Sequence, residues 1–492
     1  MIQMMLINDN IYDFHLKSQR EFLFTPRIIN PVRVSNAVIF SADEQIRQTK
    51  KVINEKMPWI KVDVLSDPVS ASNYKSEKLS VFLFDDTAMT FVDTEKICRN
   101  NQDVVLVLLS SNPFVQCSPH SIAEERYPYT TKTDLIFAVN KTEFVPDQII
   151  TAVLRCAEDK LNIEKYSRER RFIFLIVDDE PRWFSQFLPV LYNIIGQRAD
   201  VMITRTYEET LEFLFGVDAD SKINDEEYLS CGHGDDVVCL ITDIFFPKGK
   251  DLSGDAGRAL VKLMNRYYPR IPIIVASKAE LADDLRNIAY IMPKGDPGSL
   301  QTLSDYIHDF TGMGNFIIRS KTEDEYHRIR NIRELYEILL KAEKETKSGQ
   351  RLRELLEYYG KIDYFSTWLY MHGFRELGDQ IRPRHDRGRR LVTVLRRYLK
   401  REILRMNFTP LIIDGNKIFT LQSLLHLLRT IDPIKIQWFT DNDVFSTWLD
   451  RKGYAELAEE LRPIHGRGAR FEKTLADLVE KWINIYQERI KY

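Results

Sequence analysis

The sequence predicts an α/β protein that continues into an all-α region: two doubly wound (βα)5 domains followed by two helical repeat modules. Three observations predict this. Short runs rich in Val, Ile and Leu alternate with helix-length amphipathic stretches as far as about residue 316, and the alternation occurs twice. Beyond about residue 320 strand signals nearly vanish, and a segment that begins at 364 recurs 80 residues later, at 444.

The composition is typical of a globular protein of several domains. The chain has 492 residues, 44% of them hydrophobic, and 69 Lys and Arg against 72 Asp and Glu leave a formal charge of -3. This excludes disordered, collagen-like and fibrous proteins, and no apolar run approaches the roughly 20 residues of a membrane helix. Five cysteines without a CxxC pair favour a reducing, cytoplasmic environment over a disulfide framework or a zinc site.

The first α/β domain is predicted over 33–156, after an N-terminal segment of 1–32. Its apolar runs are NAVIF, KVDVL, SVFLF, VVLVLLS and DLIFAV, which begin at 36, 61, 80, 104 and 134. Because continuous apolar strands separated by helices form a parallel sheet covered on both faces, these runs predict one doubly wound domain. Residues 157–171, AEDKLNIEKYSRERR, then predict a charged helical linker that holds the two α/β domains at a semi-fixed separation.

The second α/β domain is predicted over 172–316 and shows the clearest alternation. Its apolar runs are FIFLIV, VMIT, VVCLIT, PIIVAS and AYIM, which begin at 172, 201, 237, 272 and 289. Apolar positions three or four apart predict helices between and after them, over 183–195, 207–215, 256–268, 281–287 and 299–310. The size fits a second doubly wound domain, so this half of the chain reads as a duplication.

The helical modules are predicted over 321–408 and 409–492. Both contain the pattern FSTWL, followed by Gly, Glu-Leu and Leu-Arg-Pro or a close variant. Trp368 and Trp448, with Phe365 and Phe445, could stack on a ligand, but aromatic residues three apart in a helix are more often core, and core is the interpretation we adopt.

Polar and charged residues gather where the strands of the second domain end. Asp178 and Asp179 follow its first strand, Asp243 its third, Ser277 ends its fourth, and Lys294 follows its fifth. Because the carboxyl ends of parallel strands meet in one crevice, these side chains are expected together. Three gathered carboxylates repel one another unless a hard divalent cation is present, and oxygen ligands suit Mg²⁺. Acids, a hydroxyl and a cation in one crevice predict a phosphoryl site.

At these residues the sequence resembles the receiver domain of two-component response regulators. The segments IVDDEP, ITDIFFP, IIVASK and MPKG occur in the order and close to the spacing of that family, over 172 to about 316. The resemblance implies that Asp243 accepts a phosphoryl group from a sensor histidine kinase, a phosphotransfer protein or a small phosphodonor. It implies Mg²⁺ held by Asp178, Asp179, Asp243 and the backbone carbonyl of Phe245. Lys294 would pair with the phosphoryl oxygens, and Ser277 would hydrogen-bond one of them.

The sequence departs from the family at three places. The loop after Asp243 is several residues longer than usual, and Gly295 follows Lys294 where the family commonly has a cis-forming Pro. The family's aromatic switch position holds Ile291, so a switch would combine Ser277 with the neighbouring Tyr290.

The first domain lacks the acid pair of the second. Ser41 and Ala42 stand where Asp178 and Asp179 stand in the second domain. An acceptor aspartate, a hydroxyl and a lysine have counterparts at Asp85 or Asp86, Ser110 and Lys141. Without the first-strand acids Mg²⁺ binding is expected to be weak, which predicts a pseudo-receiver used for docking or dimerisation.

A basic stretch distinguishes the first helical module. Basic residues crowd one side of a predicted helix within 389–405, and they are Arg389, Arg390, Arg396, Arg397, Lys400 and Arg401. Such a helix could contact nucleic acid, an acidic protein or a membrane surface, or could be a solvated face.

These patterns predict an atypical bacterial response regulator of the cytoplasm. Mg²⁺-dependent phosphorylation of Asp243 would gate interactions of the helical output with an unknown partner protein, without enzymatic activity beyond this self-phosphorylation. A homodimer remains open, and nucleic acid is not the favoured partner. Two alternatives are a transcriptional regulator that binds DNA through 389–405, and an adaptor that works without phosphorylation.

Overall fold

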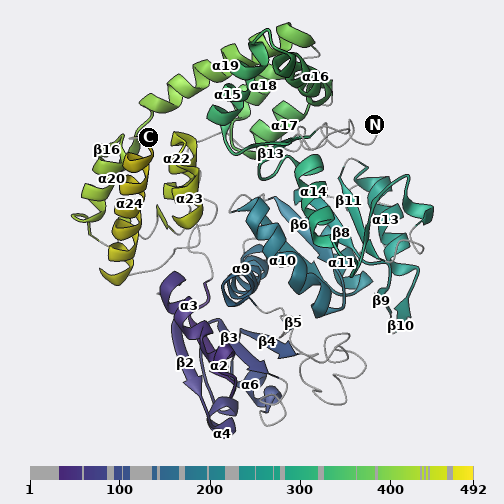
Figure 1. Ribbon diagram of the computed structural model, residues 1–492. Coiled ribbons are helices and arrows are strands. Elements are labelled where there is room, and N and C mark those ends of the chain that lie inside the picture. The colour runs from purple at the N-terminus through teal and green to yellow at the C-terminus, as the bar shows by residue number, and fades with distance from the viewer. Residues whose placement is uncertain are drawn as a thin grey trace. The chain divides into compact units, whose positions relative to one another are not determined.

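The structure is a computed structural model and divides into two compact units (Figure 1). One unit runs from the first described strand to residue 303, and the other holds residues 304 onward together with the end of helix α10. The described residues are 33–57, 60–85, 93–101, 103–110, 136–140, 145–165, 172–196, 199–216, 232–249, 251–269, 271–277, 283–319, 326–361, 363–382, 386–432, 435–436, 439–440, 444–461 and 469–490.

The first sheet has five parallel strands in the order β2-β1-β3-β4-β5. The strands are β1 (Asn36–Phe40), β2 (Lys61–Leu65), β3 (Ser80–Asp85), β4 (Val104–Ser110) and β5 (Ile136–Asn140). Helices α2 (Glu44–Arg47), α3 (Thr49–Lys56), α4 (Pro68–Ser72) and α6 (Thr94–Asn100) connect them. All six residues of β3 are buried, as expected for a central strand covered on both faces.

The second sheet is also parallel and has the order β12-β11-β8-β6-β7. Counted along the chain, this is the same doubly wound order as in the first sheet, with the third strand in the middle. Its strands are β6 (Ile173–Val177), β7 (Asp200–Thr204), β8 (Val237–Thr242), β11 (Ile273–Ser277) and β12 (Tyr290–Pro293). Its helices are α10 (Pro181–Ile195), α11 (Tyr207–Phe215), α13 (Ala256–Tyr267) and α14 (Ser299–Thr311).

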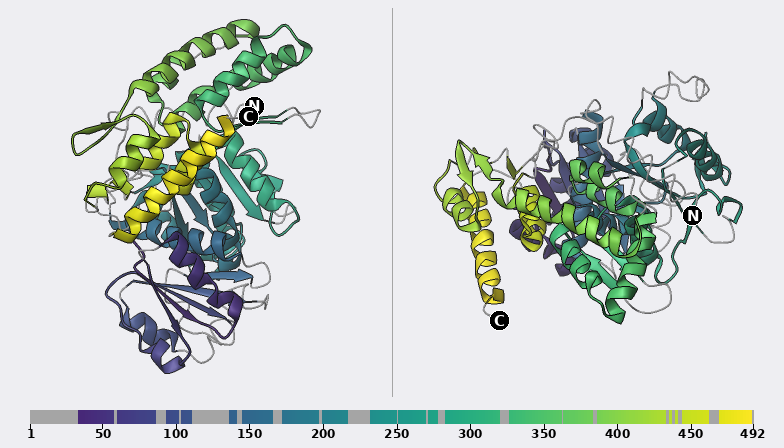
Figure 2. Two further views of the ribbon diagram at one scale, coloured as in Figure 1. Left: turned by 60° about the vertical axis from the view of Figure 1, so that its left-hand side comes forward. Right: turned by 90° about the horizontal axis from the view of Figure 1, so that it is seen from above.

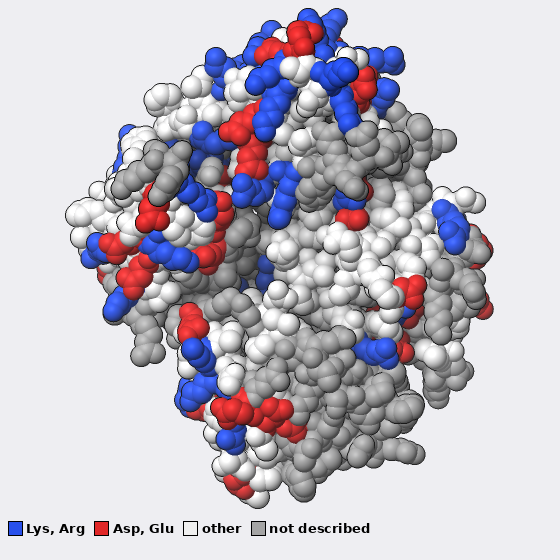
Figure 3. Space-filling model, viewed as in Figure 1, with Lys and Arg blue, Asp and Glu red and all other residues white. Residues whose placement is uncertain are grey.

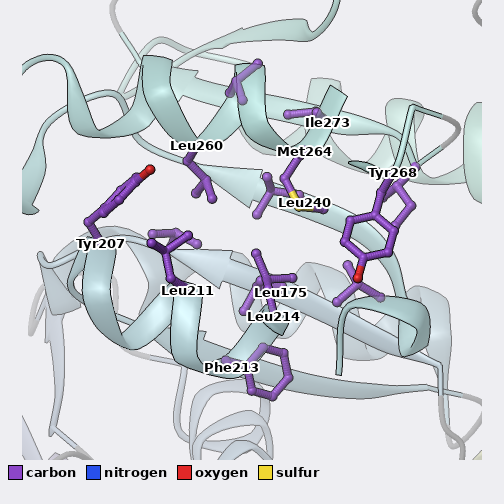
Figure 4. Close-up of a cluster of buried hydrophobic side chains, with 14 of the residues drawn as sticks. Leu175, Tyr207, Leu211, Phe213, Leu214, Leu240, Leu260, Met264, Tyr268 and Ile273 are labelled. Carbon is purple, nitrogen blue, oxygen red and sulfur yellow. The ribbon is translucent and has the colours of Figure 1, made fainter. Parts of the chain in front are cut away.

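The core of the second sheet fills the space between the strands and helices α11 and α13 (Figure 4). Leu175 and Leu240 from the strands meet Leu211 and Leu214 of α11 and Met264 of α13, all five 1% exposed or less. Apolar side chains from strands and helices therefore hold this half together.

Two features of the second half differ from the sequence expectation. The helix expected over 281–287 is reduced, among its described residues, to a single 3-10 turn at η6 (Asp283–Leu285). The long loop after Asp243 forms a hairpin of β9 (Phe246–Lys248) and β10 (Asp251–Ser253). Gly249 N donates to Glu208 Oε1 at 2.9 Å, which ties the hairpin to α11.

Helix α9 (Pro146–Lys165) replaces the expected spacer over 157–171, of which 166–171 lie outside the described residues. The described part of the expected linker is helical, as predicted, but its charged residues Glu158, Asp159 and Lys160 are buried, at 7%, 2% and 5% exposed. Glu158 accepts hydrogen bonds from Arg33 and from Val34 N, and Asp159 accepts them from Tyr192 Oη and Val201 N. Buried charges need such partners, and these partners lie far away in sequence.

The C-terminal unit is predominantly helical, as expected. Its helices are α15 (Ile332–Glu343), α16 (Lys347–Lys361), α17 (Tyr364–Met371), α18 (Arg375–Ile381), α19 (Gly388–Phe408), α20 (Leu421–Leu428), α22 (Val444–Lys452), α23 (Ala455–Leu461) and α24 (Ala469–Ile490). Helices α15 and α19 lie side by side (Figure 2). Two antiparallel hairpins were not expected, β13 (Phe316–Arg319) with β14 (Tyr326–Ile329), and β15 (Leu411–Ile413) with β16 (Asn416–Ile418).

The repeated aromatic residues of this unit are core, which confirms the sequence interpretation. Trp368 and Trp448 are 0% and 1% exposed, and Phe365 and Phe445 are 2% and 3% exposed. The indole nitrogen of Trp368 donates to the carbonyl oxygen of Gly314 at 3.0 Å.

Among the described helices, none combines the length and the apolar character needed to cross a membrane.

Candidate functional site

The candidate site lies at the carboxyl edge of the second sheet, where three strands deliver charged side chains. Asp178 follows β6, Asp243 follows β8 and Lys294 follows β12. The Lys294 ammonium lies 2.7 Å from Asp178 Oδ2 and 2.6 Å from Asp243 Oδ2. One cation thus bridges two aspartates that are 65 residues apart in sequence.

Tight backbone packing fixes the position of Asp243. Its Oδ1 accepts a hydrogen bond from Ile244 N at 2.6 Å, and Gly257 N donates to Ile244 O at 3.0 Å. A Cβ atom at Gly257 would lie 2.3 Å from the carbonyl oxygen of Asp243. The first turn of α13 can therefore approach this backbone only because residue 257 is a glycine.

Burial sets the charge balance of the site. The side chains of Asp178, Lys294 and Asp243 are 1%, 7% and 13% exposed. Burial raises the pKa of Asp178 to about 7, although the Lys294 ammonium acts in the opposite direction. Burial would lower the pKa of Lys294, but the two carboxylates outweigh it and the pKa is raised. The lysine is therefore held as a cation.

Asp179 is the residue after Asp178, and no ion pair of Asp179 is found within the described part of the chain. Burial, followed by the nearby carboxylates of Asp178 and Glu180, raises the pKa of Asp179 to about 7. Burial also raises the pKa of Glu180. Three neighbouring acids therefore hold their protons more tightly than free carboxyl groups, and a bound cation would favour their ionised forms.

The donor set has the chemistry of a hard-cation site. All of its side-chain donors are carboxylate oxygens, which suit Mg²⁺, and the buried Oδ2 of Asp178 lies 2.7 Å from the Lys294 ammonium. Within the described part of the chain, however, no three His, Cys, Asp or Glu side chains are grouped closely enough to hold a metal ion. An ion at this edge would complete its ligands with backbone carbonyls and water, as Mg²⁺ commonly does.

The expected switch pair is not brought together. Ser277 ends β11 and is 4% exposed, and its carbonyl accepts a hydrogen bond from Lys294 N at 3.2 Å. Tyr290 begins β12 opposite Ile274, whereas Ser277 lies opposite Pro293. The register thus separates the two residues by three positions, about 10 Å along the strands. Phe245, the expected donor of a metal-binding carbonyl, has a side chain that is 37% exposed.

Sequence reasoning missed Trp183, which lies in the first turn of α10. The Lys294 ammonium is 5.2 Å from the centre of a Trp183 ring, and the guanidinium of Arg182 is 4.3 Å from it. The signal was available in DDEPRW, where a tryptophan follows the acid pair within one helical turn.

The first sheet has a different edge. Ser41 Oγ donates a hydrogen bond to Asp85 Oδ2, and Asp43 N donates to Ser41 Oγ at 3.0 Å. Both Ser41 and Asp85 are buried. Ser110 ends β4, while the other two predicted counterparts, Asp86 and Lys141, lie outside the described residues. A hydroxyl group therefore occupies the place next to Asp85 that Asp178 occupies next to Asp243.

The basic residues of α19 are partly neutralised by acids of the same unit. Arg396 pairs with Glu343 at 2.6 Å, Arg390 with Asp386 at 2.8 Å, and Arg389 with Glu345. The remaining three, Arg397, Lys400 and Arg401, are exposed. Figure 3 shows Lys and Arg atoms gathered over this part of the molecule with acidic atoms among them.

Comparisons with known proteins leave the chain without a family. No family model matches it, and no curated protein matches it. A Salmonella typhimurium protein described as sugar-binding matches at 10% identity over 62% of this chain and 96% of its own, with a TM-score of 0.18. The C-terminal domain of glucosamine-fructose-6-phosphate aminotransferase from Francisella tularensis matches at 10% identity over 63% and 95%, with a TM-score of 0.19. Similarity at this level carries no information about function.

Proposed function

We propose that the second sheet carries a receiver-like phosphoacceptor site in which Asp243 is phosphorylated and thereby regulates the helical C-terminal unit. The single observation that carries the proposal is the Asp178–Lys294–Asp243 bridge at the carboxyl edge of a doubly wound sheet. The carboxyl edge is where open α/β sheets bind ligands. The motif resemblance over 172–316 supports Asp243 as the residue that accepts the phosphoryl group.

The proposed reaction is transfer of a phosphoryl group to Asp243. A carboxylate oxygen of Asp243 attacks phosphorus, the bond from phosphorus to the donor breaks, and the donor leaves with the electron pair. Lys294 already contacts Asp243, so it can follow the incoming phosphoryl oxygens and offset their charge. Asp178 and Asp243 would hold Mg²⁺, which would offset the remaining negative charge while bound.

The regulatory part of the proposal follows from the same bridge. In the described structure Lys294 connects the ends of β6, β8 and β12. A phosphoryl group on Asp243 adds negative charge and acceptor oxygens, and these compete with Asp178 for the ammonium. The competition would change the packing at the end of β12, which leads directly into α14 and the helical unit. The partner of that unit would be a protein.

Intact mass spectrometry tests the proposal. The purified protein is incubated with acetyl phosphate and Mg²⁺, and one added phosphoryl group is expected. Asp243→Ala should abolish the addition, and Asp85→Ala, at the corresponding place in the first sheet, should leave it unchanged. If no group is added, the proposal fails and a phosphorylation-independent adaptor becomes the better explanation. If the addition persists in Asp243→Ala, the proposal fails because another residue accepts the phosphoryl group.

The DNA-binding alternative receives less support from the geometry. Three of the six basic residues that suggested it are in ion pairs with acids of their own unit, so fewer charges are available to phosphates. A DNA-binding helix would give an affinity that falls steeply with salt. Absence of such binding at low salt would exclude this alternative.

A further inference from the structure

The contacts of Lys294 on the side away from the aspartates point to a residue that has no role in the chemistry described above. A lysine side chain is long and flexible, and holding it in one place costs conformational entropy. Two carboxylates attract it but do not by themselves confine it. Its side chain is nevertheless only 7% exposed, so another group must cover it.

Trp183 is that group, because its ring lies 5.2 Å from the Lys294 ammonium. A cation within about 6 Å of an indole ring is attracted by it. The backbone of Trp183 is held in the first turn of α10, where its N–H donates to Glu180 O at 3.0 Å. The guanidinium of Arg182 lies 4.3 Å from the ring centre, so the ring contacts two cations.

Gly295 makes room for this cover. It has a φ of +81°, and a Cβ atom there would lie 3.0 Å from the edge of the Trp183 ring. A larger residue would require the ring or the backbone to shift. Gly295, which stands where the resembled family commonly has a proline, therefore lies directly next to Trp183, which follows the acid pair.

We infer that Trp183 is a positioning residue, whose ring confines the Lys294 ammonium between Asp178 and Asp243 and shields it from solvent. The shielding does not depend on phosphorylation, whereas its consequence for phosphoryl transfer rests on the proposed function. In the proposed reaction, a confined ammonium meets the incoming phosphoryl group without first having to be ordered. Trp183 touches the lysine and acts through it.

Chemical labelling of lysine tests the shielding without any phosphoryl transfer. The full chain is treated with N-hydroxysuccinimidyl acetate, and the acetylation rate of Lys294 is measured by peptide mass spectrometry. Trp183→Ala should raise this rate about fivefold, and Trp183→Phe, which keeps an aromatic ring, should stay near the wild-type rate. Exposed Lys262 provides an internal standard in every sample. An unchanged Lys294 rate in Trp183→Ala would overturn the inference.

A matched pair of glycine variants approaches the same contact from the other side. Gly295→Ala and Gly298→Ala both place a side chain at a positive φ, +81° and +87°, but only the first meets the Trp183 ring, and Gly298 has open space around it. Backbone strain is therefore similar in the two. Gly295→Ala should raise Lys294 acetylation and Gly298→Ala should not; equal rates would contradict the inference, even if Trp183→Ala fails to fold.

Phosphorylation kinetics then separate this inference from the proposed function. With acetyl phosphate and Mg²⁺, Trp183→Ala should slow the modification of Asp243 about tenfold, and Trp183→Phe should restore most of the rate. If the wild-type protein is never phosphorylated, the proposed function fails while the labelling result still decides the role of Trp183. In Trp183→Ala, Lys294 could be acetylated faster while Asp243 is phosphorylated at the wild-type rate. The ring would then shield the lysine without positioning it, and the inference fails.

Discussion

The two parallel sheets have the same strand order but different chemistry at their carboxyl edges. In the first sheet Phe40 pairs with Phe84, so the next position brings Ser41 beside Asp85. In the second sheet Val177 pairs with Thr242, so the next position brings Asp178 beside Asp243. A hydroxyl faces the aspartate in one sheet and a carboxylate faces it in the other.

This comparison teaches that one set of residues specifies the sheet and another set specifies the chemistry at its carboxyl edge. The central strands β1, β3, β6 and β8 of the two sheets are built mostly from buried apolar residues, and either edge is compatible with them. In the first sheet the hydroxyl of Ser41 donates a hydrogen bond to Asp85. In the second sheet Asp178 and Asp243 are both acceptors, and the Lys294 ammonium from a third strand lies between them. The same strand order therefore carries different chemistry next to its central aspartate in the two halves.

Removal of that cation should have the largest effect. Lys294→Ala leaves two buried carboxylates without their counter-charge, and breaking a buried ion pair costs about 3 kcal/mol or more. Peptides from β6 and β8 should lose hydrogen-exchange protection, while peptides from β1 and β3 should keep it. Lys262→Ala, at an exposed position of α13, is the control. Equal loss of hydrogen-exchange protection in both sheets would contradict the conclusion that Lys294 stabilises the second sheet alone.

Asp179 allows the effect of burial at the second edge to be measured through the pH dependence of stability. Its pKa in the folded chain is raised from 3.8 to about 7, so the folded state holds the proton more tightly than the unfolded state. Stability is therefore lost as the pH rises from about 4 to about 7. Asp179→Asn removes this loss and should stabilise the protein by about 2 kcal/mol more at pH 8 than at pH 5.

Thermal unfolding of wild type and Asp179→Asn at the two pH values, without added Mg²⁺, gives this difference directly. The exposed Asp255→Asn, in the same half of the chain, serves as the control. A stabilisation that does not grow with pH would mean that Asp179 does not hold its proton more tightly in the folded chain than in the unfolded chain.

A substitution at the carboxyl edge of the first sheet should have the smallest effect on stability. Ser41→Ala removes the hydroxyl that donates to Asp85, and the loss of one such hydrogen bond costs about 1 kcal/mol. Hydrogen exchange in β1 and β3 should become slightly faster, with no effect on phosphorylation of Asp243. Ser66→Ala, at an exposed position, should leave exchange unchanged. A loss as large as that of Lys294→Ala would mean that the Ser41–Asp85 contact matters as much to the first sheet as the lysine bridge matters to the second.

The sequence predicts the strands well because their signal is local. Nine of the ten strands in the two sheets begin within one residue of the apolar run that predicted them, and β5 begins two residues later, at Ile136 rather than at 134. The hairpin β9–β10 was missed because its residues, FPK and DLS, include a proline and charged groups and lack an apolar run.

Residues whose environment depends on distant partners were predicted less well. Glu158 is buried because it accepts from Val34 N, 124 positions away, and no local pattern reveals this. Asp178, Asp243 and Lys294 were predicted to lie together because strand ends converge in any parallel sheet. Trp183 was missed because its contact with Lys294 depends on the space left by Gly295, which only three-dimensional packing reveals.

Helix α9 has a consequence for how the second sheet meets other chains. Strand β7 is the last strand of its sheet. Two side chains of α9 bond to the backbone where this strand begins, Asp159 to Val201 N in the strand and Arg155 to Ala199 O just before it. An open strand edge is a template for pairing with another molecule, as in domain swapping and amyloid. The helix blocks that template at the two bonded residues. A fragment that begins at the second sheet would lose this protection and become prone to aggregation.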